Sequence, residues 1–149
     1  MQTKSFRGMI ADEGIDMISL HTNTGSTGYR IKKFELLPND PTANNEAVVK
    51  IFSVPKTAVP DTAIDFSDNT LLAAGLWSNN SITHTYSDDL VVVFDNTTFN
   101  QDIYITHKSS SGQLPVNYYI EVEMVKLDIS ENTVATLKDI RNITEPSPT

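Results

Sequence analysis

The chain has 149 residues, the length of one ordinary domain, and 39% of them are apolar, which is enough for a hydrophobic core. It has no cysteine, which excludes disulfides, thiolate metal sites and cysteine nucleophiles. Its formal charge of −8 argues against a partner made of duplex nucleic acid, because binding a duplex requires a basic surface.

No apolar run approaches the length of about 18 residues that a membrane-spanning helix needs. The first residues lack the charged-then-apolar pattern of a secretion signal, so we expect no cleaved signal. We therefore expect one domain over residues 1–144, with no membrane partner. Residues 145–149 hold two prolines and should form a flexible tail.

Branched residues dominate the composition, since Val, Ile and Thr are abundant and Ala is scarce. Such side chains suit a pleated sheet better than a helix. Short apolar runs alternate with clusters of Asn, Asp, Ser and Gly, which predicts an all-β, antiparallel, jelly-roll-like β-sandwich of about eight strands. In chain order, the expected strands are residues 4–11, 15–22, 27–37, 47–54, 82–86, 90–94, 102–107 and 116–127.

Three segments between these strands have their own expectations. Residues 56–63 contain Pro60 and should form an irregular crossover. Residues 68–74 are expected to form one or two helical turns, with Asp68 as the N-cap. The serines and glycine of 109–112 predict a mobile loop.

The last segment of the domain changes its hydrophobic period. Val134, Leu137 and Ile140 recur at helical spacing, and Ser130 can cap the segment. We therefore expect a short C-terminal helix over residues 131–142.

Two strands change face along their length, which a strand of period two cannot do without an extra residue. Between Ile31 and Phe34 the apolar set switches sides, and this predicts a β-bulge at Lys32–Lys33. The late strand switches after Met124, and here two interpretations stay open. One is a second bulge; the other is a strand covered by the core on one face and by a partner subunit on the other.

Charge is distributed unevenly along the chain. Residues 1–50 are balanced, whereas residues 57–107 carry seven acids and neither Lys nor Arg. Such a stretch is typical of a solvated acidic face. Calcium is the alternative, but none of the acidic pairs has the spacing of a known calcium loop, so we expect no metal and no cofactor. The groups considered are Asp65 with Asp68, Asp88 with Asp89, and Asp95 with Asn96 and Asp102.

The sequence contains no catalytic motif. His21, His84 and His107 lie in or beside expected strands without metal-ligand spacing, and no Gly-x-Ser-x-Gly motif occurs. Glu121 and Glu123 lie on one strand face about 7 Å apart, which superficially suits a glycosidase pair. Alternating glutamates are far commoner on exposed strands, so we expect no enzymatic activity.

Three stretches, residues 28–34, 117–123 and 135–142, together resemble small virion structural proteins of marine tailed bacteriophages. That group looks like capsid decoration, or cement, proteins with a compact β-sandwich. The resemblance implies a non-enzymatic protein on the capsid surface of the virion, assembled in the host cytoplasm. It would stabilise the head by clamping neighbouring subunits of the major capsid protein.

This role leads to two sets of candidate residues. The balanced N-terminal third is the natural docking surface, and its capsid-interface candidates are Phe6, Arg7, Arg30, Lys32 and Lys33. The late strand has more apolar residues than one core face can use, which predicts a homo-oligomer, a trimer before a dimer. Its candidates are Tyr118, Tyr119, Met124, Val125 and Leu127.

The alternative function is a carbohydrate-binding β-sandwich module of a phage tail or fibre. Trp77 lies beside Asn79 and Asn80, where its ring could stack on a sugar. It is the only Trp and no second aromatic platform is near in sequence, so a core or oligomer contact is favoured for it.

Overall fold

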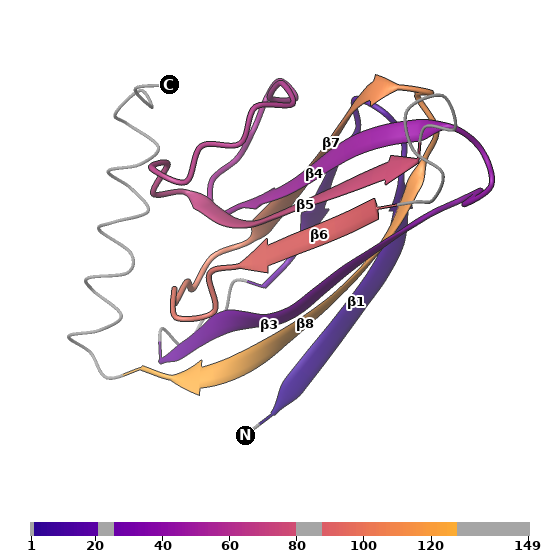
Figure 1. The fold of residues 1–149 in the computed structure, drawn as a ribbon. Helices are drawn as coiled ribbons and strands as arrows, with labels where there is room; N and C mark the ends of the chain where they lie inside the picture. The colour runs from indigo at the N-terminus through magenta and orange to yellow at the C-terminus, as the bar shows by residue number, and fades with distance from the viewer. Residues whose placement is uncertain (1, 21–25, 80–87, 128–149) are drawn as a thin grey trace.

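The computed structural model describes residues 2–20, 26–79 and 88–127, and its described part is all-β. Eight strands form two antiparallel sheets packed as a sandwich, as the sequence predicts (Figure 1). The strands are β1 (Thr3–Ile10), β2 (Ile15–Ile18), β3 (Thr27–Pro38), β4 (Asn45–Phe52), β5 (Leu71–Asn79), β6 (Asp88–Val93), β7 (Ile103–Ser111) and β8 (Val116–Lys126).

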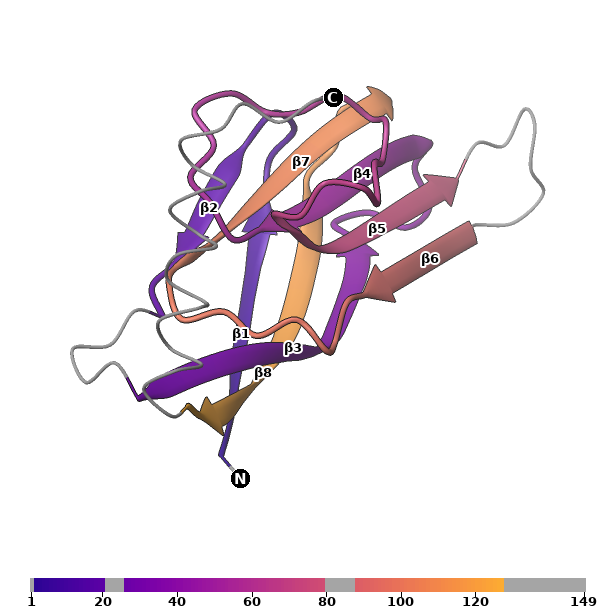
Figure 2. The ribbon, with the colours of Figure 1, turned by 90° about the vertical axis from the view of Figure 1, so that its left-hand side faces the viewer.

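The strand order follows that of a jelly roll except at β6. One sheet has the order β1-β8-β3 and the other β2-β7-β4-β5-β6, so the first strand pairs with the last and the second with the seventh (Figure 2). In a regular jelly roll β6 would also pair with β3. Here β6 pairs with β5 and only lies alongside β3.

The core lies between the two sheets and follows the alternation of each strand. Ile51 and Ile105 of the larger sheet face Ile31 and Ile120 of the smaller one, and all four are almost completely buried. Each such side chain contributes about 1.5–3 kcal/mol through its removal from water.

The predicted bulge in β3 is confirmed. The pairing of β3 with β8 shifts between Ile31 and Lys33, so Lys32 is the extra residue. The switch in β8 has a different outcome, because its pairing with β3 continues through Met124 and Val125 without a shift. The second bulge is therefore absent from the described ladder.

The helical turns expected over residues 68–74 are wrong, because β5 begins at Leu71. Asp68 does act as a cap, but of a turn: its Oδ1 accepts a hydrogen bond from the backbone N–H of Thr70 at 2.8 Å. The following residues are buried on both sheet faces, since Leu71 and Ala74 pack with Phe52 on the outer side. A continuous apolar run of this kind does not distinguish a strand from a helix.

The mobile loop expected over residues 109–112 is wrong for three of its four residues, because β7 extends to Ser111. Ser109 is buried, and its hydroxyl donates to the carbonyl of Glu46 at 3.0 Å. The turn itself forms at Gly112, whose φ of 91° favours glycine. Residues 53–70 contain no strand, so the irregular structure expected over residues 56–63 is confirmed. The expected crossover is wrong, because the segment joins β4 to β5, which are neighbouring antiparallel strands of one sheet. This segment is therefore the β4–β5 loop.

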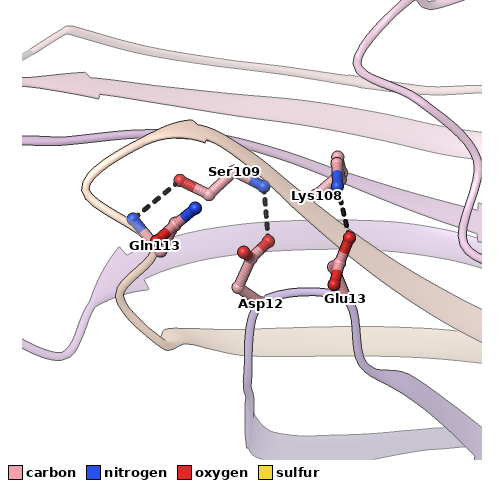
Figure 3. Close-up of polar contacts among 5 residues, drawn as sticks. All are labelled: Asp12, Glu13, Lys108, Ser109 and Gln113. Carbon is pink, nitrogen blue, oxygen red and sulfur yellow. Dashed lines mark hydrogen bonds and ion pairs between the residues drawn. The ribbon is translucent and has the colours of Figure 1, made fainter.

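The connection between β1 and β2 crosses from one sheet to the other, and two of its side chains bind β7 (Figure 3). Asp12 Oδ1 accepts a hydrogen bond from the backbone N–H of Ser109 at 2.7 Å. Glu13 Oε1 forms an ion pair with Lys108 Nζ at 2.5 Å. This turn therefore holds the two sheets together at their β1 and β2 edges.

Several sequence expectations lie outside the described residues. They are the strand at 82–86, the helix at 131–142, the tail at 145–149, and the positions of His21 and His84.

Candidate interaction face

The outer face of the three-stranded sheet is built from the residues that alternate with the core positions. Cross-strand pairing arranges these residues in rows across β1, β8 and β3. One row consists of Arg7, Tyr119 and Glu35, and the next consists of Met9, Asn117 and Leu37. The capsid-interface candidates of β1 and β3 thus belong to one sheet, although they are distant in sequence.

The cations of this face differ in their partners. Lys32 forms an ion pair with Glu123 at 3.4 Å. Lys33 forms ion pairs with Glu35 at 3.5 Å and Glu121 at 3.9 Å. These lysines are therefore largely neutralised within the sheet.

The remaining cations among the capsid-interface candidates are Arg30 and Arg7. Arg30 donates from Nε to Thr98 Oγ1 at 3.0 Å. Within residues 2–20, 26–79 and 88–127, Arg7 has no ion pair and no side-chain hydrogen bond, and it is exposed. Phe6 alternates with Arg7 on β1 and packs against the core, so it presents less of its side chain to a partner.

A hollow of about 880 Å³ crosses this face. Its lining comes from β1, β8, β3 and β6, in the order in which these strands lie side by side. Three exposed apolar side chains border it: Met9 and Leu37, each 58% exposed, and Leu90, 60% exposed. Arg7, Glu35, Asp89, Asn117 and Tyr119 supply its polar groups.

The oligomer-interface candidates do not form one surface. Tyr118 is buried, with its ring against Gly8, and Leu127 is buried close to Gly28 and Thr98. Met124 is half-buried and packs against the core. The apolar excess read from the late strand is therefore largely used within the chain itself. Of the five candidates, Tyr119 and Val125 alternate onto the outer face.

Trp77 is a core residue, as the sequence favours. It is 7% exposed and lies on β5 opposite Ala47, with its side chain on the inner face. It offers no free ring to a sugar.

The glutamates considered as a catalytic pair, Glu121 and Glu123, lie on the outer face of β8. Both are half-buried, and their carboxylates form ion pairs with Lys33 and Lys32.

A second, smaller hollow of about 470 Å³ lies under the β4–β5 loop, on the outer side of the five-stranded sheet. Lys50 lines it, although its side chain is buried and its Nζ donates to the carbonyls of Asp61, at 2.9 Å, and Ala63. Burial lowers the pKa of Lys50, while the charge of Asp61 opposes this shift. These hydrogen bonds hold the β4–β5 loop against the sheet.

Before β5, the acidic segment 57–107 forms a turn over residues 65–68. Asp65 Oδ1 accepts hydrogen bonds from the hydroxyl and backbone N–H of Ser67, and these lower the pKa of Asp65. Among the residues with described positions, no three His, Asp or Glu side chains gather as metal ligands would. The described residues also include no helix long and apolar enough to cross a membrane.

No protein-family model matches the chain, and no curated protein sequence is similar to it.

The sequence did not single out Met9, Leu37 or Leu90. Each occupies the solvent-facing phase of its strand, and an apolar residue in that phase is the signal that could have identified them.

Proposed function

We propose that this protein is a non-enzymatic decoration protein of a phage capsid. It binds the outside of an assembled head through the outer face of the three-stranded sheet and clamps neighbouring capsid subunits. The observation that carries the proposal is the composition of this face. Exposed cations of a chain with charge −8 gather there beside exposed apolar side chains.

The charge distribution supports this orientation. A strongly acidic protein that approaches an acidic lattice is repelled unless its contacting face is balanced. The outer face of β1, β8 and β3 is balanced, because its lysines alternate with Glu35, Glu121 and Glu123. The acidic residues of the loop between β4 and β5, Asp61, Asp65 and Asp68, would then point away from the head.

The architecture agrees with the role. Jelly rolls occur in viral capsid domains and in lectins, and one fold serves many functions. A decoration protein also needs no deep site, because many weak contacts on a symmetric lattice add up through avidity.

The test is co-sedimentation of the purified chain with heads of its phage that lack it. Saturable binding at a fixed ratio to the major capsid protein is the expected result. Free chain in the supernatant at all concentrations would contradict the proposal. A homo-oligomer, a trimer before a dimer, remains part of this proposal, and light scattering of the free chain measures it against the monomer mass of 16.5 kDa.

A further inference from the structure

We propose that the hollow across β1, β8, β3 and β6 is the docking site of one extended segment of a partner protein. This segment would carry apolar side chains and a carboxylate. The inference rests on the proposed function, since it names the part of the sheet face that holds the capsid subunit and the chemistry of the segment held.

Arg7 specifies the carboxylate. In the described part of the chain the other cations of this face have partners: Lys32 pairs with Glu123, Lys33 pairs with Glu35, and Arg30 bonds Thr98. Arg7 lines the hollow without such a partner. A guanidinium offers a planar pair of donors that matches a carboxylate, and the pair strengthens when a partner excludes water from it.

The apolar border specifies the rest of the segment. Met9, Leu37 and Leu90 are three of the six exposed large apolar side chains of the described chain, and all three line this hollow. Apolar side chains that meet in one concave place, with polar groups around them, are typical of a protein-binding site.

The shape favours a narrow segment over a broad surface. β6 lies alongside β3 without pairing to it, and its residues Asp89, Leu90 and Val91 form one wall of the hollow. A flat sheet face of a second copy fills such a depression less well than a single extended chain. A glycan is also less suited, because Tyr119 is the one aromatic ring exposed to the hollow and Lys33 Nζ lies 5.8 Å from its centre.

The first experiment reverses the charge of Arg7. Arg7→Glu should weaken co-sedimentation with heads at least about tenfold, as expected for an Arg contact that is desolvated in the complex. The matched control is Lys126→Glu, which makes the same change in net charge at the exposed end of β8. It should bind within about twofold of the wild type, as is usual for a charge outside the contact.

The second experiment removes apolar surface. Met9→Ser should weaken binding several-fold, whereas Met17→Ser should not. These methionines form a matched pair, because Met17 is 57% exposed on β2 and does not line the hollow. Unchanged melting temperatures show that the variants fold.

The outcomes separate the two proposals. If the wild type fails to bind heads, both the function and this inference fall. If it binds and Arg7→Glu and Met9→Ser behave like their controls, the inference fails and the function stands. Two further results also overturn the inference. They are a free dimer that Arg7→Glu dissociates, which makes a second copy the occupant, and release from heads by oligosaccharide, which makes a glycan the occupant.

Discussion

Tyr118 donates a hydrogen bond from its phenol to Asp16 Oδ2 at 3.1 Å, which joins β8 of the smaller sheet to β2 of the larger one. The ring lies against Gly8, where a Cβ atom would come within 2.7 Å of the phenol oxygen. Burial, together with the charge of Asp16, raises the pKa of Tyr118 to about 12.

Replacing Tyr118 with Phe should lower the free energy of unfolding by about 1–2 kcal/mol at pH 7, because Asp16 loses its donor. The alkaline response should change as well. The unfolded chain releases the phenol proton near pH 10 and the folded chain only near pH 12, so this stabilisation is lost as the pH rises from 10 to 12. Urea unfolding at pH 7, 9 and 11 measures both effects, with Tyr119→Phe as the control. Equal losses in wild type and Tyr118→Phe between pH 9 and 11 would argue against the coupling.

His107 should make the protein acid-sensitive. It is buried on β7, its Nδ1 lies 3.1 Å from the carbonyl oxygen of Ile10, and its Nε2 has no partner among the described residues. Burial lowers its pKa below 6.5, although the Ile10 carbonyl opposes this shift. The unfolded chain therefore binds a proton at a higher pH than the folded chain, and stability falls as the pH drops below about 6.5.

The variant His107→Gln keeps an amide donor for Ile10 but cannot titrate. It should be less stable than the wild type at pH 7, and its free energy of unfolding should decline less between pH 7 and pH 5. Parallel declines in the two proteins would show that His107 is not the sensitive group.

We expect Lys50 to hold the β4–β5 loop, residues 53–70, against the sheet. Lys50→Met keeps the aliphatic stem but leaves the carbonyls of Asp61 and Ala63 without their donor, which should cost about 1–3 kcal/mol. Faster proteolysis within 53–70 is the local readout. The control is Lys56→Met, which should change cleavage little. In the wild type, the amine of Lys56 lies 4.2 Å from the centre of the Phe52 ring. Identical cleavage rates in all three proteins would count against the tie.

Gly75 sets the close approach of the two sheets. A Cβ atom there would lie 2.8 Å from Leu36 Cδ1 and 3.1 Å from Val91 Cγ2. Gly75→Ala should therefore cost about 1–3 kcal/mol, in the range of an overpacked core. Thermal unfolding measures it, and a melting temperature equal to that of wild type would mean that Leu36 moves aside without penalty.

The sequence predicted the fold where one face of a strand is buried and the other is solvated. The bulge at Lys32 is an example, because Ile31 and Phe34 are both buried and the extra residue between them lets both face the core. β5 was missed because Leu71 and Leu72 are both buried, which removes the alternation that marks a strand.

The candidate face could be predicted only in part. Strand phase placed Arg7 and Lys33 on the surface, but which cations are neutralised depends on the register between β8 and β3, which strand phase alone does not give. The hollow depends on β6 lying beside β3 without pairing, and that relationship joins segments about fifty residues apart.

Hydrogen–deuterium exchange of the chain bound to heads, compared with the free chain, tests the account most directly. The account predicts slower exchange on binding in the strand segments around the hollow, which are residues 7–9, 34–37, 89–91 and 117–119. Exchange in the β4–β5 loop, residues 53–70, should not change. Protection confined to the β4–β5 loop or to β2, with the strands around the hollow exchanging as in the free chain, would contradict the account.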